Sequence, residues 1–290
     1  GLAHRGRDLA RGTGGRVTLT IDLTGLLVLL NLLALGYLSW RYASDITRLV
    51  YGLRARRLHA EMERAMRCKI VRLVGGIRDA SADEWIAAIR VAAKSGQELH
   101  LLLHTDGGSS HTAVRVKHAI VDHPHDVVAH VPNRAWSAGT SLALVCDRIV
   151  MGPDSILGPV DRAWKREQAD TFAVEELQAH EAGVSVDVVR ARSCADEAAA
   201  DLLSFRARRR AMHYRIHPGQ RLRRASEVAA VDEHLVKMLV RGGWGHHWRA
   251  IFRADARGLG LDVADAQAKA GEDFAELARL THLSLPEDQR

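Results

Sequence analysis

The sequence predicts an α/β protein with a largely parallel sheet and one long apolar helix ahead of it. Between residues 68 and 160, short apolar runs typical of strands alternate with amphipathic segments typical of helices, a pattern that favours parallel pairing. From Leu23 to Trp40 the chain carries no formal charge over 18 residues. With 290 residues, 47% of them hydrophobic and 26% charged, the chain is long enough for a sizeable core and is neither disordered nor fibrous.

The elements of the sheet region follow from these runs. Strands are expected at 68–74, 98–104, 126–132 and 148–151, and helices at 82–95, 110–122 and 138–145. The run at 98–104 is apolar almost throughout, as in a strand covered on both faces. Residues 165–240 are expected to be mostly helical, followed by a Gly/Trp/His-rich turn, a helix and a short strand up to residue 263.

The composition divides the chain into six segments. These are a basic segment 1–22, a transmembrane helix 23–40, an amphipathic linker helix 41–67, an α/β core 68–164, a helical part of the same domain 165–270, and a C-terminal tail 271–290.

The apolar segment has the length of a membrane span. A helix of 18 residues measures about 27 Å, close to the thickness of the hydrocarbon layer. Tyr37 and Trp40 lie at one end, where interfacial aromatic residues are expected, and arginines flank both ends. The alternatives are a buried core helix and a signal-peptide core, and no small-residue cleavage site supports the latter. A slight excess of arginine after the segment predicts a single-pass membrane protein whose large domain is cytoplasmic.

The charge of the chain resides in its first part. The net charge is +6, and residues 1–57 hold nine arginines against three aspartates, so the remainder is balanced. This argues against a nucleic-acid partner. We interpret the arginine run from Arg206 to Arg210 as a solvated or subunit-contacting helix face. Three widely spaced cysteines and scattered histidines predict no disulfide framework, no metal site and no cofactor.

Two loops carry the chemical signal. The first, His104-Thr-Asp-Gly-Gly-Ser-Ser, follows an expected buried strand, and its paired glycines allow a sharp turn that exposes backbone N–H groups. The second places Ser137 where the chain enters a helix of small residues. A serine at that position is most often an N-cap. It also suits a nucleophile, because helix-end N–H groups stabilise a developing oxyanion.

Together the two loops resemble a known family. The matching residues are His104-Thr105, Gly107-Gly108, Ser137-Ala138-Gly139-Thr140, Asp147, Ile149-Val150-Met151 and Leu157-Gly158-Pro159-Val160-Asp161. The chain resembles the serine dehydrogenase proteinase family of the signal peptide peptidase A clan, which shares the Clp protease/crotonase fold. The resemblance extends from the apolar segment to the Gly243-Trp244-Gly245-His246 turn.

The resemblance implies a fold and a mechanism. It implies a Clp/crotonase-like α/β fold with an N-terminal transmembrane helix and a helical C-terminal extension, assembled as a homo-oligomer. Ser137 would attack a peptide carbonyl to form an acyl-enzyme. By analogy with Clp protease, the oxyanion would be held by the N–H groups of Ala138 and of the Gly107–Gly108 turn. A substrate peptide would bind beside that turn by strand addition.

The general base is where the sequence departs from the family. A lysine is expected on the helix near Ser204 to Ala211, but arginines occupy that stretch, and arginine cannot act as a base. Of the six lysines, Lys165 is the one nearest downstream of Ser137 and is the tentative base. His111 is a second candidate. Asp106 replaces the usual proline of the glycine turn and would oppose a nearby oxyanion.

We interpret the sequence as that of a membrane-anchored serine endopeptidase, that is, a hydrolase that acts on peptides or proteins without a cofactor. The first alternative is a family member that has lost proteolysis and acts as a membrane-anchored scaffold or peptide-binding subunit. An acyl-CoA enzyme of the crotonase type is disfavoured because no CoA-specific signature accompanies the serine. A dehydrogenase is disfavoured because no GxGxxG motif follows a strand.

Overall fold

A computed structural model describes residues 23–166, 169–218 and 225–289. The chain forms two compact units, Gly1–Thr47 and Arg48–Arg290, which are described separately. The expected basic segment 1–22 lies outside the described residues.

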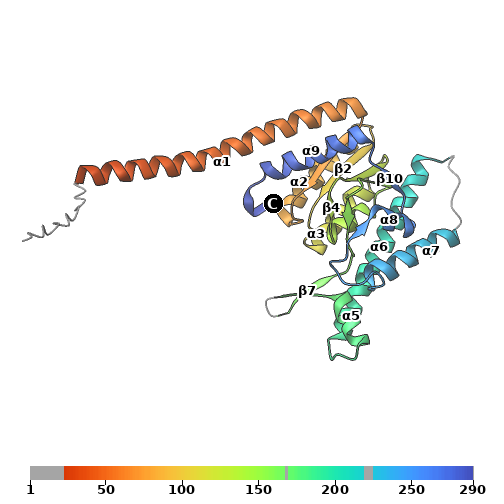
Figure 1. Ribbon diagram of the computed structural model, residues 1–290. Coiled ribbons are helices and arrows are strands. Elements are labelled where there is room, and N and C mark those ends of the chain that lie inside the picture. The colour runs from red at the N-terminus through yellow and green to blue at the C-terminus, as the bar shows by residue number, and fades with distance from the viewer. Residues whose placement is uncertain (1–22, 167–168, 219–224, 290) are drawn as a thin grey trace, which may run out of the picture. The chain divides into compact units, whose positions relative to one another are not determined.

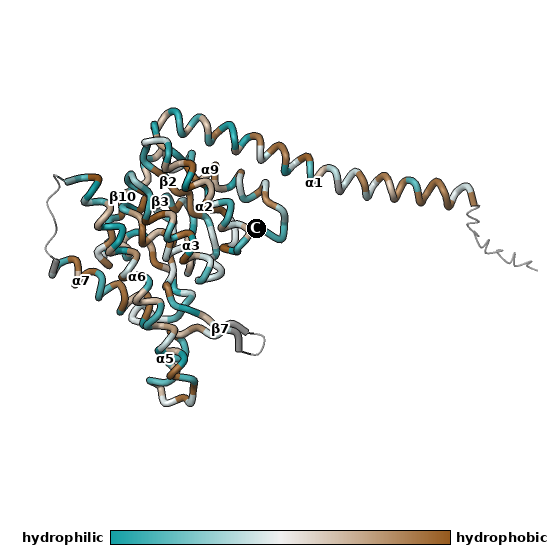
Figure 2. The backbone as a smooth tube through the Cα atoms, turned by 180° about the vertical axis from the view of Figure 1, so that it is seen from behind, coloured by the Kyte–Doolittle hydropathy of each residue, from teal (hydrophilic) through white to brown (hydrophobic). Residues whose placement is uncertain are grey.

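Helix α1 (Leu23–Met66) is a single helix of 44 residues. It runs through the boundary that the sequence suggested between an apolar helix and a separate linker helix, because no proline interrupts the helical pattern there. Its most apolar 18-residue window has a mean hydropathy of 1.8 and is 0% buried. Figure 2 shows the hydrophobic colouring of this part of α1. By length and composition, α1 is the one helix of the described chain that is suited to crossing a membrane.

The second unit is built on a parallel sheet (Figure 1). Its strands, in spatial order, are β1 (Lys69–Val74), β2 (Leu99–His104), β3 (Val127–Val131), β5 (Arg148–Met151) and β10 (Val263–Asp265). Every neighbouring pair is parallel. The expected α/β class and the four expected strands are therefore confirmed, and the short strand expected near residue 263 takes the edge of the sheet beside β5.

Helices cover both faces of this sheet. The larger core lies between the sheet and α2 (Asp79–Ala93), α3 (Ser110–Val121), α4 (Ala138–Ala143) and α6 (Val188–Ile216). The opposite face is covered by α9 (Ala268–Ser284) and by residues 48–66 of α1, with Met62, Phe274 and Leu277 buried there. Most of the segment 271–290 lies in α9, whose apolar residues recur at helical spacing.

The remaining elements complete the helical C-terminal part. They are α5 (Ala173–Glu181), α7 (Ala225–Leu235), a π-helical turn (Val236–Val240), α8 (Arg253–Gly258) and a 3₁₀ turn (Glu287–Gln289). A two-stranded antiparallel hairpin, β7 (Ala163–Arg166) with β8 (Ala169–Phe172), precedes α5. The sequence did not predict this hairpin.

A second, three-stranded sheet positions the functional loops. It joins β4 (Arg134–Ala135), β6 (Ile156–Leu157) and β9 (Ile251–Phe252), with β4 parallel to β6 and β6 antiparallel to β9. Ser137 follows β4, Asp161 follows β6, and His247 precedes β9. Three segments that are distant in sequence are thereby held side by side.

Candidate active site

The structure brings the two predicted loops together. The N–H of Thr105 donates to the carbonyl of Arg134 (3.1 Å), and the N–H of Trp136 donates to the carbonyl of Thr105 (3.0 Å). The Asp106 carboxylate pairs with the Arg134 guanidinium, with 3.1 Å between Oδ2 and Nη2. Because Arg134 compensates its charge, Asp106 is not the uncompensated obstacle to an oxyanion that the sequence suggested.

Ser137 has an unusual backbone conformation. Its φ is 50° and its ψ is −114°, and its side chain makes no capping hydrogen bond to α4. Ser137 is therefore the N-cap residue of α4 by position, but its hydroxyl group does not cap the helix. A non-glycine residue at positive φ is strained, and a strained serine at a strand-to-helix turn is the arrangement that presents a nucleophilic hydroxyl in hydrolases.

The glycine turn lies directly against Ser137. A Cβ placed on Gly107 would be 3.1 Å from the Cβ of Ser137, and one placed on Gly108 would be 2.4 Å from the carbonyl oxygen of Ile77. Only glycine permits both approaches, and both residues have positive φ. The close fit brings the backbone of the turn to the hydroxyl.

The amide groups at this turn are not equivalent. The N–H of Gly107 donates to Thr105 Oγ1 (3.0 Å), which takes it out of the expected oxyanion pair. Within the described part of the chain, the N–H groups of Gly108 and Ala138 donate to no protein acceptor. These two amides therefore remain available to a negatively charged oxygen.

A cavity of about 710 Å³ opens beside Ser137. Its wall includes the expected residues Gly107, Gly108 and Ala138, and also His111, Lys117, Asp161, His247 and Trp248. From α6 it is lined by Ala198, Asp201 and Leu202. The helix residues that face the cavity thus precede the stretch Ser204 to Ala211, where the sequence comparison had located the family lysine.

Asp161 and His247 form a buried pair in this cavity. The carboxylate Oδ1 contacts His247 Nδ1, and the two side chains are 0% and 3% exposed. Asp161 Oδ2 accepts a hydrogen bond from the N–H of Val174 (3.3 Å). The ring of Phe172 stacks on the His247 ring, with 3.8 Å between centroids. The imidazole is thus fixed in position and tautomer, with Nε2 as its second nitrogen.

Sequence reasoning missed His247. The Gly/Trp/His-rich turn was visible, but nothing in its spacing connects it with Asp161, which lies 86 residues earlier. Lys165, the tentative base, lies in β7, where the structure describes only the backbone, so its role stays a prediction. His111 lies exposed in the first turn of α3 at the wall of the cavity.

Lys117 is a second residue that the sequence analysis passed over. Its side chain is buried, at 5% exposure, in α3. Burial lowers the pKa of its ammonium group to about 8, with Asp201 opposing and Arg162 reinforcing that shift. A signal was present, because Lys117 falls on the apolar stripe formed by Ala113, Val116 and Ile120.

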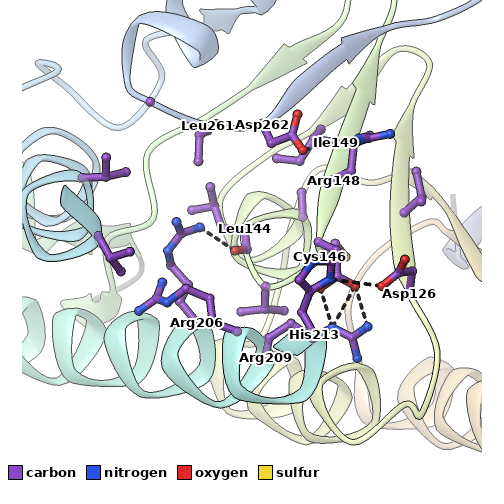
Figure 3. Close-up of a pocket in the computed structure, with 18 of the residues that line it drawn as sticks. Asp126, Leu144, Cys146, Arg148, Ile149, Arg206, Arg209, His213, Leu261 and Asp262 are labelled. Atoms are coloured by element: carbon purple, nitrogen blue, oxygen red, sulfur yellow. Dashed lines mark hydrogen bonds and ion pairs between the residues drawn. The ribbon is translucent and has the colours of Figure 1, made fainter. Parts of the chain in front are cut away.

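A second cavity, of about 380 Å³, lies at the amino ends of the strands (Figure 3). Arg209 is buried there and binds both oxygens of Asp147 (3.0 and 2.9 Å) and the carbonyl of His123 (2.8 Å). Arg206 and Arg210 both bind Asp232 (2.8 and 2.6 Å). The interpretation of this arginine run as a solvated or subunit-contacting face is therefore wrong for these three residues.

Near this cavity three side chains have metal-ligand chemistry. Asp126, His213 and His217 place one ligand atom each within 4.8 Å of one another. His213 Nδ1 and His217 Nε2 contact separate oxygens of Asp126 (3.1 and 2.7 Å). The contacts clamp the end of α6 to the start of β3, at the opposite end of the sheet strands from Ser137.

The parallel sheet with helices on both faces defines an α/β fold. The family model described as "ClpP-like SDH-type serine proteinase" matches residues 67–189. This match confirms the family resemblance and the ClpP-like fold class inferred from the sequence.

Two curated relatives come from Methanocaldococcus jannaschii. The uncharacterized protein MJ0137 is 30% identical over 184 residues, covering 63% of this chain and 58% of the relative. The uncharacterized protein MJ1495 is 30% identical over 80 residues, covering 28% of this chain and 27% of the relative. The chain thus spans little more than half of the first relative and about a quarter of the second.

Among solved structures, the chain is similar to two variants of the membrane-bound stomatin-specific protease 1510-N. One aligns with 76% of this chain and 88% of its own length, at 15% identity and a TM-score of 0.46. The other, in complex with a substrate peptide, aligns with 69% of this chain and 76% of its own length, at 16% identity and a TM-score of 0.48.

Proposed function

We propose that this protein is a serine endopeptidase that hydrolyses peptide bonds through an acyl-enzyme on Ser137. The observation that carries the proposal is the shared cavity: a strained, uncapped serine faces the same space as a buried aspartate–histidine pair. Nucleophile, base and orienting carboxylate are the three parts of a serine-protease triad. Here they occur in the chain order Ser137, Asp161, His247.

Each residue has a defined role in the first step. Ser137 Oγ forms a bond to the peptide carbonyl carbon while its proton passes to His247 Nε2. Asp161 stabilises the resulting imidazolium through Nδ1. The carbonyl oxygen becomes an oxyanion, which accepts hydrogen bonds from the N–H groups of Gly108 and Ala138. In the described residues Ser137 and His247 share no direct hydrogen bond, and such bonds often close only when substrate binds.

The second step regenerates the enzyme. The carbon–nitrogen bond breaks, and the imidazolium proton leaves with the new amine. A water molecule then gives a proton to His247 and attacks the ester carbonyl. The bond to Ser137 Oγ breaks, the carboxylic acid departs, and the proton returns to the serine. His247 replaces Lys165 as the proposed base because Asp161 orients the imidazole ring and can stabilise the imidazolium once the ring has accepted the serine proton.

The first experiment follows covalent labelling of purified protein by a fluorophosphonate probe. Ser137→Ala should abolish labelling, and His247→Asn should slow it about 10³-fold or more, as loss of a triad base does. Lys165→Ala distinguishes the two candidate bases and should label near the wild-type rate. Exposed Lys94→Met serves as a matched surface control.

The outcomes separate the competing functions. Undiminished labelling of Ser137→Ala would refute the nucleophile. Loss of labelling in Lys165→Ala, with labelling of His247→Asn unaffected, would identify Lys165 as the general base instead of His247. A folded wild-type protein that neither labels nor cleaves any peptide would favour a degenerate scaffold that binds peptides.

We further propose that residues 23–40 anchor the protein in a membrane as a single span, with the large unit in the cytoplasm and the protein working as a homo-oligomer. Its support is a charge-free stretch of α1 that is long enough for a thin bilayer and 0% buried in the described structure. Deletion of residues 1–40 should release the protein from membranes during flotation. Continued flotation of the deleted protein would contradict the anchor.

A further inference from the structure

Lys117 lies where the core alone would favour an apolar residue. It shares the buried side of α3 with Val116 and Ile120, and only 5% of its side chain is exposed. Burying an ammonium group without a partner costs several kcal/mol. The residue also lines the Ser137 cavity, so a ligand in that cavity can contact it.

The protein does not neutralise this ammonium group. In the described chain, Lys117 makes no ion pair or hydrogen bond, and its Nζ lies 4.9 Å from the centroid of the Phe205 ring. Asp201 favours the charged form electrostatically. That carboxylate is already bound by Arg162, at 2.5 Å.

The other charged side chains around the cavity have protein partners. Asp106 pairs with Arg134, and Asp161 pairs with His247. Arg162 also binds Glu197 (2.7 Å). Arg78 donates to the backbone carbonyl of Asp288. Among the buried charged side chains of the described cavity wall, Lys117 is therefore the one that makes no ion pair or hydrogen bond, and Asp201, the carboxylate that favours its charge, is held by Arg162.

We propose that Lys117 Nζ is a substrate-binding group that pairs with a carboxylate of the peptide, so that the enzyme prefers acidic substrates. This rests on the proposed peptidase function. The carboxylate has two possible sources, an Asp or Glu side chain next to the scissile bond or the C-terminal carboxylate of the peptide. Either would supply the counter-charge that the cavity lacks, and a charge-assisted hydrogen bond of this kind favours the acid over its amide by about 10- to 100-fold.

The test uses a peptide library in which each member occurs with Glu, Gln or Leu at one position and with a free or amidated C-terminus. Cleavage products are measured by mass spectrometry for the wild type, Lys117→Met and Lys117→Arg. The wild type should favour Glu over Gln, or acid over amide, by at least about tenfold. Lys117→Met should lose this preference, and Lys117→Arg should retain most of it. Lys94→Met is the exposed control and should retain it fully.

Two results would overturn the proposal. Equal cleavage of acidic and amide peptides by the wild type would show that no carboxylate is recognised. Loss of fluorophosphonate labelling in a folded Lys117→Met variant would make Lys117 part of the proton-transfer machinery instead. Selectivity for a Glu side chain over the free C-terminus, or the reverse, identifies the source of the carboxylate.

A binding measurement keeps this inference separate from the peptidase proposal. Fluorescent peptides are titrated into Ser137→Ala and into the double variant Ser137→Ala/Lys117→Met. Tighter binding of acidic peptides that depends on Lys117 supports the subsite even if no peptide is cleaved. Equal affinity of both variants for acidic and amide peptides refutes the subsite whether or not the wild type is active.

Discussion

The two cavities of the second unit treat buried charge in opposite ways. At the amino ends of the strands, Arg209 is enclosed by Asp147 and backbone carbonyls, and Asp232 binds Arg206 and Arg210. At the carboxyl ends, Lys117 is buried without an ion pair in the cavity that the strained Ser137 also lines. The comparison separates polar residues that fix α6 in place from polar residues that are left for a ligand.

The largest expected change in stability comes from removing Arg209. Arg209→Met leaves the Asp147 carboxylate buried and unpaired, which should lower the free energy of unfolding by about 3–5 kcal/mol. Denaturant unfolding measures this change. Arg208→Met is the matched control, since Arg208 pairs with Asp122 at the surface, and it should change stability by at most about 1 kcal/mol. An equal loss of unfolding free energy in the two variants would mean that the buried pair of Arg209 and Asp147 does not stabilise the fold more than a surface ion pair does.

Lys117→Met should change the free energy of unfolding in the opposite direction. Removing an unpaired buried charge should raise the free energy of unfolding by about 2–3 kcal/mol at pH 7. Because the folded-state pKa of Lys117 is lowered to about 8, the unfolded chain binds more protons than the folded one from there up to about pH 10.5. Wild-type stability should therefore rise with pH in this window, and the gain from Lys117→Met should shrink.

Denaturant unfolding at pH 7 and at pH 9.5 measures this effect, with Lys94→Met as the exposed control. A destabilised Lys117→Met protein at pH 7 would show that the lysine contributes a structural contact instead.

The face of the sheet covered by α9 belongs to neither cavity and responds to acid. Burial lowers the pKa of His104 to about 4, helped by Arg134, and burial holds the pKa of His130 well below its usual value, helped by His100. Between about pH 6.5 and pH 4 the unfolded chain binds more protons, so stability falls as the pH is lowered. At pH 5 we expect a loss of about 1–2 kcal/mol from His104 and a further loss from His130, measured by unfolding against pH. A flat profile between pH 7 and pH 5 would contradict the burial of these rings.

The smallest expected effect concerns the strained serine itself. Ser137→Gly should abolish labelling yet raise the free energy of unfolding by about 1 kcal/mol, because glycine adopts its positive φ without strain. Ser141→Gly, in the neighbouring helix α4, should instead lower it by about 1 kcal/mol. Calorimetry of the two variants and the wild type measures these changes in stability. A destabilised Ser137→Gly protein would show that the backbone at residue 137 is not strained.

The regular elements of the fold could be predicted from the sequence, and the short ones could not. The strands around residues 70, 101, 129 and 149 are apolar runs between turn signals, and α2 and α3 show helical periodicity. The strands β4, β6 and β9 have two residues each, which is too short for any period. Since these strands position the site, the pairing that holds it together was not visible in the pattern.

The site could be predicted in part for the same reason. Ser137 and the glycine pair lie in loops with local sequence signals, whereas His247 is brought to Asp161 only by tertiary structure. The arginine run illustrates a second limit. The sequence shows that α6 carries a run of arginines, but only the packed structure shows that Arg206 and Arg209 point inward. Lys117 could have been found, because a lysine on an apolar stripe contradicts the pattern around it.

The three-stranded sheet also sets the moment at which the proposed chemistry becomes possible during synthesis. A nascent chain that has left the ribosome only as far as β5 contains Ser137 but lacks both later partners. His247 arrives with β9, near the end of the chain, and its strand must pair with β6 before the imidazole meets Asp161. A chain that ends before β9 therefore carries Ser137 without the proposed base, so the proposed hydrolysis requires β9 to be in place.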